Sequence, residues 1–405
     1  MIHQYKNNGY NIVMDVCSGA IHVVDDVTYD VIALYEEKSL EEIENELSYS
    51  KEDIEEAYKE VTSLKEEGLL FTEDIYEDYI KEVKSRKTVV KALCLHIAHD
   101  CNLACRYCFA EEGEYKGHRE LMSAKVGKAA LDFLVANSGN RHNLEVDFFG
   151  GEPTMNFGVV KEVVEYGRSL EEKHNKHFRF TLTTNGVLLN DEIMEFANKE
   201  MDNVVLSVDG RKEIHDYMRP TRNGKPSYDL IMPKFIRFAE SRHQQKYYVR
   251  GTFTNRNLDF SKDVLHLADL GFEQISMEPV VGQPEEPYAI QEKDLPQIFD
   301  EYDRLAKEMI KREKAGKGFN FFHFMIDLTG GPCVAKRLSG CGSGTEYLAV
   351  TPWGDLYPCH QFVGEEKFLL GNVFDGIKRT DICDEFRSCN VYTDRKSTRL
   401  NSSHQ

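Results

Sequence analysis

The sequence has 405 residues, of which 69 are acidic and 50 basic, so its formal net charge is -19 at pH 7. This length exceeds one compact core and predicts two or three domains, while the acidity argues against nucleic acid as a partner, because phosphate binding needs clustered Lys and Arg. No apolar run approaches the ~20 residues that span a bilayer, and the first residues lack the basic-then-apolar order of a secretory signal, so we expect a cytoplasmic protein without a membrane partner.

Residues 1–85 predict a small separate domain. Strand-like runs at Tyr10–Asp15 and Ala20–Asp25 flank a Ser18-Gly19 turn, and three amphipathic helical stretches follow at Thr28–Glu36, Ser39–Leu47 and Lys51–Glu67. A hairpin followed by three helices resembles the winged-helix-like peptide-recognition domain of many peptide-modifying enzymes. The resemblance implies that this domain holds the leader of a precursor peptide, since a hairpin edge can accept an added strand. A structural appendage is the alternative.

Residues 86–315 predict an α/β fold. Strand-like segments recur at Val89–Ile97, Leu144–Phe149, Phe178–Thr184, Val204–Val208, Tyr247–Thr254 and Gln274–Glu278. Helical segments between them are expected at Ala124–Asn137, Val159–His174, Asp191–Lys199, Asp229–His243 and Ser261–Leu270. This alternation predicts parallel βαβ units, and six strands give an open, partial (β/α)6 barrel. Its chemistry should lie where the strands end in loops.

Cys101, Cys105 and Cys108 follow the first of these strands, and Phe109 comes next. Ten cysteines in a cytosolic protein favour metal binding over disulfides. Three thiolates on one loop would leave one iron of a [4Fe–4S] cluster without a protein ligand, so that a cofactor could bind it. Three unconnected buried cysteines would not account for this spacing.

This run resembles the signature of the radical S-adenosylmethionine (radical SAM) superfamily. The resemblance implies that S-adenosylmethionine chelates the open iron, and that an external electron donor reduces the cluster. Reductive cleavage of the carbon–sulfur bond then releases a 5′-deoxyadenosyl radical.

Further motifs lie at the ends of the following strands. In Gly150-Gly151-Glu152-Pro153 the glycines permit a close backbone approach, and the carboxylate can accept a hydrogen bond from an ammonium. The resemblance implies that this stretch binds the methionine amine. The other expected cofactor contacts are Asn185, then Ser207 and Asp209 for the ribose hydroxyls, and Arg219 near the cofactor carboxylate. Strand-end turn chemistry explains several of these residues equally well, and Glu278 is either a ligand contact or a solvated carboxylate.

A last region, residues 316–393, contains Cys341 and Cys359 in a glycine-rich setting. It resembles the opening of a SPASM extension, which holds auxiliary iron–sulfur clusters, and Cys389 would be a further ligand. Cys333 and Cys383 are either ligands or incidental. The expectation for Cys17 and Cys94 is buried core thiols, and His22, His96, His174 and His323 are expected in core or surface roles. Residues 394–405 resemble a translated sequencing adapter, so we expect a read-through tail after a truncated gene and only an incomplete auxiliary set.

Taken together, the parts resemble maturases that form thioether crosslinks in "six cysteines in forty-five" (SCIFF) peptides. The resemblance implies an oxidoreductase acting on a Cys-rich precursor peptide, in which a substrate cysteine joins a carbon of an acceptor residue. An anaerobic sulfatase-type maturase, or another SPASM peptide-modifying enzyme, is the alternative, and so is a cluster-bearing module without catalysis.

Overall fold

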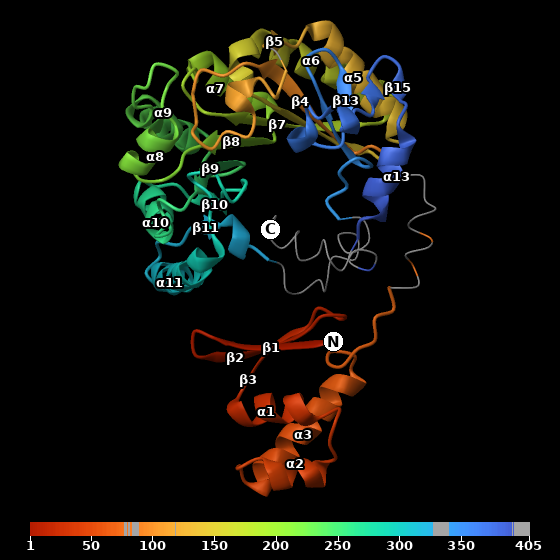
Figure 1. Cartoon of the computed structure of the whole chain (residues 1–405), viewed down its shortest axis with the longest axis vertical. Coiled ribbons are helices and arrows are strands. Elements are labelled where there is room, and N and C mark those ends of the chain that lie inside the picture. Colours follow the sequence, from red (N-terminus) through yellow and green to blue (C-terminus); the bar gives the residue numbers. More distant parts are fainter. Residues whose placement is uncertain are drawn as a thin grey trace. The chain divides into compact units, whose positions relative to one another are not determined.

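The computed structural model describes residues 1–76, 79, 82, 89–117, 119–326, 340–390 and 392. The chain divides into two compact units (Figure 1). We call the first, built on Met1–Ser85, the N-terminal unit, and the second, which holds Arg86–Phe324 and the chain from Ser339 on, the sheet unit. Cys333 and the predicted tail 394–405 lie outside the described residues.

The N-terminal unit is a three-stranded antiparallel sheet followed by three helices. The strands are β1 (Ile2–Asn7), β2 (Tyr10–Asp15) and β3 (Ile21–Val24), and the helices are α1 (Asp26–Leu34), α2 (Leu40–Glu46) and α3 (Lys51–Glu66). The predicted hairpin and helices are present. Strand β1 was not predicted, because its polar run shows no alternation of apolar residues. Val13, Val31, Ile54 and Val61 are fully buried and join the sheet to α1 and α3.

The sheet unit is built on parallel strands, which confirms the predicted α/β class. Its six parallel strands pair in chain order: β4 (Ala92–His99), β6 (Asn143–Gly150), β7 (His177–Thr184), β8 (Asn203–Ser207), β9 (Tyr247–Phe253) and β10 (Gln274–Pro279). Figure 1 shows them running around an arc with helices on its outer side. All six lie within three residues of the predicted segments at either end, since their apolar runs are bounded by turn residues.

Helices connect these strands. They are α5 (Ala124–Asn137), α6 (Phe157–His174), α7 (Asp191–Glu200), α8 (Lys212–Met218), α9 (Tyr228–Ser241), α10 (Ser261–Asp269) and α11 (Leu295–Lys314). The sequence did not predict α8 or α11. Helix α8 is one of the shortest and buries only His215 and Met218, so its periodicity is weak. Within the described residues, no helix combines the length and the apolar composition needed to cross a membrane.

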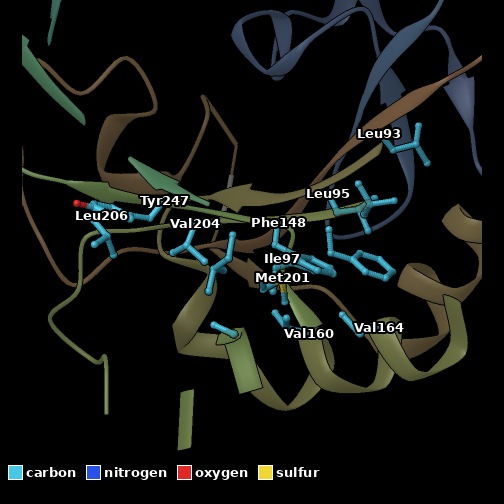
Figure 2. Close-up of a cluster of buried hydrophobic side chains, with 14 of the residues drawn as sticks. Leu93, Leu95, Ile97, Phe148, Val160, Val164, Met201, Val204, Leu206 and Tyr247 are labelled. Carbon is cyan, nitrogen blue, oxygen red and sulfur yellow. The ribbon is translucent and has the colours of Figure 1, made fainter. Parts of the chain in front are cut away.

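The two faces of β4 have different environments. Leu93, Leu95 and Ile97 point to the outer helices, where Val160 and Val164 of α6 complete the core (Figure 2). Cys94 points to the opposite, inner face and belongs to a second buried cluster with Tyr115, Ala349 and Tyr357. Because side chains alternate along a strand, the inner face is left for polar and sulfur-bearing groups.

Short elements extend the sheet at both edges. The strand β12 (Tyr347–Val350) pairs in parallel with β4, and β11 (Asn320–Phe321) pairs in parallel with β10. Among the described residues, the remaining strands and α-helix are β5 (Glu120–Leu121), β13 (Asp355–Tyr357), β14 (Gly371–Asn372), β15 (Gly376–Ile377) and α13 (Thr380–Ser388). The region of the late cysteines is therefore joined to the parallel sheet by backbone hydrogen bonds.

Candidate functional site

The loop 101–108 begins two residues after β4 ends, at the carboxyl edge of the parallel sheet. Cys101, Cys105 and Cys108 are each half-buried and none is in a disulfide. The backbone of this loop is held by the end of α8 and the residues that follow it: Ala104 N–H donates to the carbonyl of Pro220 at 2.8 Å, and Arg106 N–H to that of Met218 at 2.9 Å. We call residues 101–108 the cysteine loop.

The three thiols share one electrostatic neighbourhood. Burial, followed by the negative charges of Glu152 and Cys108, raises the pKa of Cys101 to about 12. Burial also raises the pKa of Cys105, and charges on Cys108 and Cys101 act in the same direction. Thiols in this position become thiolates when a positive group lies against them, and iron is such a group.

The donor chemistry fits an iron–sulfur cluster with one open iron, because three thiols meet on one loop. Within the described part of the chain, no three His, Cys, Asp or Glu side chains are already grouped tightly enough to hold a metal ion. A cluster bound at this loop would therefore draw the three thiols closer together.

Gly150 and Gly151 bring the end of β6 against the start of the cysteine loop. Gly151 N–H donates to the carbonyl of Ala98 at 2.7 Å, and Glu152 N–H to that of Asp100 at 2.8 Å. A Cβ on Gly151 would lie 2.1 Å from the Asp100 oxygen, and Gly150 has a φ of +114°. The close backbone approach predicted for these glycines is thus present, and the partner in the structure is the chain itself.

Glu152 is buried and its carboxylate is bonded within the protein. Oε1 accepts hydrogen bonds from the hydroxyls of Thr154 and Thr184 at 2.5 and 2.7 Å and from Thr154 N–H, and Oε2 accepts one from Asn185 N–H at 2.8 Å. Burial raises the pKa of Glu152 against these bonds. The carboxylate therefore links the ends of β6 and β7, and Oε2 keeps acceptor capacity for an ammonium. Pro153 begins the short 3-10 turn Pro153–Asn156 that Glu152 caps.

Asn185 lies beside the cysteine loop, as its assignment to the cofactor site requires. Its side-chain amide donates to Asn102 Oδ1 at 2.7 Å and approaches Cys101 Sγ at 3.7 Å. Ser207 ends β8 and is half-buried on the inner face. These two residues and the end of β6 thus converge on one edge of the sheet.

Asp209, predicted as a ribose contact, has partners within the protein, and its contact with a cofactor stays a prediction. It is fully buried, and its carboxylate accepts two contacts from the Tyr107 hydroxyl, at 2.9 and 2.7 Å, and one from Thr252 N–H at 3.0 Å. Arg219 Nε lies 3.0 Å from Asp209 Oδ1, so the arginine predicted near a cofactor carboxylate is paired with a protein carboxylate. The acceptor positions of Asp209 are therefore used by protein donors, and Asp209 and Arg219 form a buried ion pair within the fold.

Sequence reasoning did not single out Tyr107, which connects the cysteine loop to this buried pair. Its signal was present, since it stands inside the cysteine motif between Cys105 and Cys108. His96, expected in a core or surface role, is buried, and its Nδ1 lies 2.9 Å from Nε2 of His99. Burial lowers the pKa of His96 well below its usual value. Glu278 lies on β10 in an ion pair with Arg250 at 2.5 Å.

The late cysteines are carried by adjoining segments. Ser343 Oγ and Gly344 N–H both donate to the carbonyl of Pro358 at 3.0 Å, which places the turn after Cys341 against the residue before Cys359. A Cβ on Gly340 would lie 3.9 Å from the backbone oxygen of Cys389. The three predicted auxiliary ligands therefore come from neighbouring backbone.

The other cysteines divide as follows. Cys94 is buried, as expected, whereas Cys17 is only half-buried and lies in the turn after β2, so the core prediction for Cys17 is wrong. Cys383 is buried in α13, among the apolar core residues.

One ring contact connects the two groups of cysteines. Phe109 follows Cys108 and His360 follows Cys359, and their ring centroids lie 5.7 Å apart. His360 also packs on Phe149 of β6 at 5.2 Å. The cysteine loop and the Cys359 turn thus adjoin on the inner face of the sheet.

Comparison with known proteins agrees with this geometry. Residues 95–242 match the model of the Radical SAM superfamily. The uncharacterized protein MJ0907 of Methanocaldococcus jannaschii is 29% identical over 289 residues, which is 71% of this chain and 90% of that protein. A cysteine-type anaerobic sulfatase-maturating enzyme of Clostridium novyi is 24% identical over 321 residues, covering 75% of this chain and 82% of the enzyme.

A solved structure extends the similarity over more of the chain. The crystal structure of Streptococcus suis SuiB bound to precursor peptide SuiA is 17% identical, with a TM-score of 0.52, and covers 98% of this chain and 89% of SuiB. This likeness concerns the fold. The uncovered 2% is too short to contain the N-terminal unit, so the fold comparison includes residues 1–85.

Proposed function

We propose that this chain, which carries a radical SAM domain at residues 95–242, is a peptide maturase that installs thioether crosslinks in a ribosomally synthesised, Cys-rich precursor peptide. The observation that carries the proposal is the combination of the cysteine loop at the sheet's carboxyl edge with a separate N-terminal unit of strands and helices. SuiB, whose comparison with this chain covers 98% of it at a TM-score of 0.52, was solved with a precursor peptide bound. By analogy, the N-terminal unit would hold a peptide leader in a winged-helix-like manner.

The residues that would hold the cofactors follow from the site. Cys101, Cys105 and Cys108 would bind a [4Fe–4S] cluster, and the end of β6 with Asn185 and Ser207 would receive S-adenosylmethionine. When bound, these groups supply a carbon radical that can take a hydrogen atom from a C–H bond. Cys341, Cys359 and Cys389 would hold an auxiliary iron–sulfur group in a SPASM-like region.

The protein's own contribution is positioning. Forming a thioether breaks one C–H and one S–H bond and makes one C–S bond. A hydrogen atom, a proton and one electron leave the peptide, and an iron–sulfur group held by Cys341, Cys359 and Cys389 would be able to accept the electron. Residues on the inner face would keep the acceptor carbon and the substrate thiol close together and away from water.

Crosslinking is tested with the full chain, reconstituted anaerobically with iron and sulfide. It is incubated with S-adenosylmethionine, dithionite and a Cys-rich precursor peptide encoded by a neighbouring gene. We expect the peptide to lose two hydrogens for each crosslink, measured by mass spectrometry, together with release of 5′-deoxyadenosine. Release of 5′-deoxyadenosine without any change in peptide mass would refute the proposal, and its absence would favour a non-catalytic module.

Sulfatase-type maturation is the second candidate, favoured by the similarity to the Clostridium novyi enzyme. Such an enzyme would oxidise a Cys or Ser side chain and would not need the N-terminal unit. Excess leader peptide, added in trans to the full chain, separates the two activities. It should inhibit leader-dependent crosslinking, whereas oxidation of a short sulfatase-type peptide should continue unchanged.

A further inference from the structure

A buried charge pair lies directly beneath the cysteine loop. The Tyr107 hydroxyl donates to Asp209 at 2.7 Å, and Arg219 Nε lies 3.0 Å from the same carboxylate. The Arg219 guanidinium carbon is 5.4 Å from the centroid of the Tyr107 ring. Asp209 is 0% exposed and the Arg219 side chain 12%. We call these three residues the loop anchor.

The loop anchor is fixed from behind by a second set of hydrogen bonds. Asp209 N–H donates to His215 Nδ1 at 3.3 Å, and His215 Nε2 lies 3.0 Å from Ser227 Oγ. Ser227 Oγ in turn donates to the carbonyl of Arg219 at 2.5 Å. These bonds start at Asp209 and return to Arg219, so the two charged residues have little freedom to separate.

Folding stability alone does not explain this arrangement. A buried ion pair gains little over well-packed apolar residues of similar volume, because both charges lose their hydration. The Tyr107 hydroxyl also joins this pair to the cysteine loop, which lies about a hundred residues earlier in the chain and carries the proposed cluster ligands. An effect of the ion pair on the cysteine loop accounts for where the pair lies.

The charge of Arg219 acts on that loop. Arg106, the neighbour of Cys105, donates its N–H to the carbonyl of Met218, the neighbour of Arg219, at 2.9 Å. The Arg219 guanidinium also lies over the ring of Tyr107, two residues after Cys105. In a medium of low dielectric constant, such charges change the energy of any negatively charged group bound at the loop.

We propose that the loop anchor is a positioning device that holds Tyr107 of the cysteine loop and sets the electrostatic potential at Cys105, with Arg219 stabilising the reduced form of a bound cluster. This inference rests on the proposed function, because it concerns the cluster assigned to Cys101, Cys105 and Cys108. Cluster potentials depend on net charge and hydrogen bonding around the sulfurs, which are the quantities that the loop anchor controls.

The test is the reduction potential of the reconstituted full chain, followed by electron paramagnetic resonance, with iron content measured in parallel. Arg219→Gln should shift the potential of the cluster to more negative values, and Asp209→Asn should shift it to more positive values. Arg219→Lys retains the charge and should stay near the wild type. Arg168→Gln is the control, because Arg168 pairs with Glu200 at 3.2 Å on the outer helices.

Tyr107→Phe covers the case in which a charge variant does not fold. It keeps the ring and removes only the hydroxyl that donates a hydrogen bond to Asp209, so that the negative charge of Asp209 is less stabilised and the potential should shift in the same direction as in Arg219→Gln but less. Iron should also leave the cluster faster when a chelator is added. The inference would be overturned if the potentials do not change, or if Arg219→Gln and Asp209→Asn shift the potential in the same direction.

Failure of the proposed function would look different. A wild-type chain that binds no cluster after reconstitution would contradict both proposals. A wild-type chain that binds a cluster and cleaves S-adenosylmethionine, with variants that keep its potential, would contradict only the role of the loop anchor.

Discussion

Replacing Gly151 by alanine should displace the cysteine loop. The new Cβ would lie 2.1 Å from the Asp100 oxygen and 2.6 Å from its carbonyl carbon, and both are backbone atoms. Asp100 would have to retreat by about 1.3 Å to reach the 3.4 Å at which ordinary contact begins. That movement would also strain the 2.8 Å hydrogen bond from Glu152 N–H to Asp100.

The expected cost follows from these two effects. Overpacking costs about 1–3 kcal/mol, and a weakened hydrogen bond adds about 1 kcal/mol. We therefore expect the free energy of unfolding of the sheet unit to fall by about 2–4 kcal/mol in urea titrations of the apo chain. Iron uptake should fall as well, because Asp100 directly precedes Cys101.

Gly158→Ala is the matched control for this experiment. Gly158 lies in the first turn of α6 and a Cβ there would meet no atom within 4 Å, so the substitution should be neutral or stabilising by up to about 1 kcal/mol. If Gly151→Ala matches the wild type in unfolding free energy and iron content, the close approach of β6 to the cysteine loop is not needed for either.

Three further substitutions test other parts of the fold. Burial lowers the pKa of His215 to about 4, so neutral His215 stabilises the fold fully above pH 6.5. This contribution should decline by up to about 3 kcal/mol as the pH falls toward 4. In urea titrations, the free energy of unfolding of His215→Gln should depend less on pH across this range. Asp15 accepts hydrogen bonds from Cys17 N–H, Thr72 N–H and the Thr72 hydroxyl, so Asp15→Asn should destabilise the N-terminal unit by about 2 kcal/mol in hydrogen exchange and leave 5′-deoxyadenosine release unchanged. Arg242 donates to the carbonyls of Ala197 and Met201 at 2.9 Å, and Arg242→Lys cannot make both bonds, so it should cost about 1–2 kcal/mol in thermal unfolding.

Much of the fold could be predicted because its signals are local. Strands such as β6 and β7 are short runs with regularly spaced apolar residues, and they end at Gly150 and Thr184, next to turn residues. Helix α11 was missed although Ile298, Tyr302 and Leu305 have helical spacing, so its signal was available. Strand β1 had no such signal, since only its pairing with β2 shows that it is a strand.

The site was predictable in position and less so in contacts. The position of Asn185 and Ser207 follows from strand order, because parallel strands end at one edge. The partners of Asp209 do not follow, since Tyr107, Thr252 and Arg219 approach it from three different segments. A sequence motif indicates which residue type a position needs. Which neighbouring residues form hydrogen bonds with that residue depends on how the chain packs.

The strand-end carboxylates show what this implies for recognition of a cofactor. Asp209 is bonded from three sides, and Glu152 retains acceptor capacity mainly at Oε2. A buried carboxylate that loses a partner pays a desolvation cost, so neither residue can exchange its present donors for a ligand without compensation. Recognition at this edge should therefore depend on backbone groups and on Asn185 and Ser207. The carboxylates would fix where those groups stand, and their loss should impair cluster binding before it impairs affinity for S-adenosylmethionine.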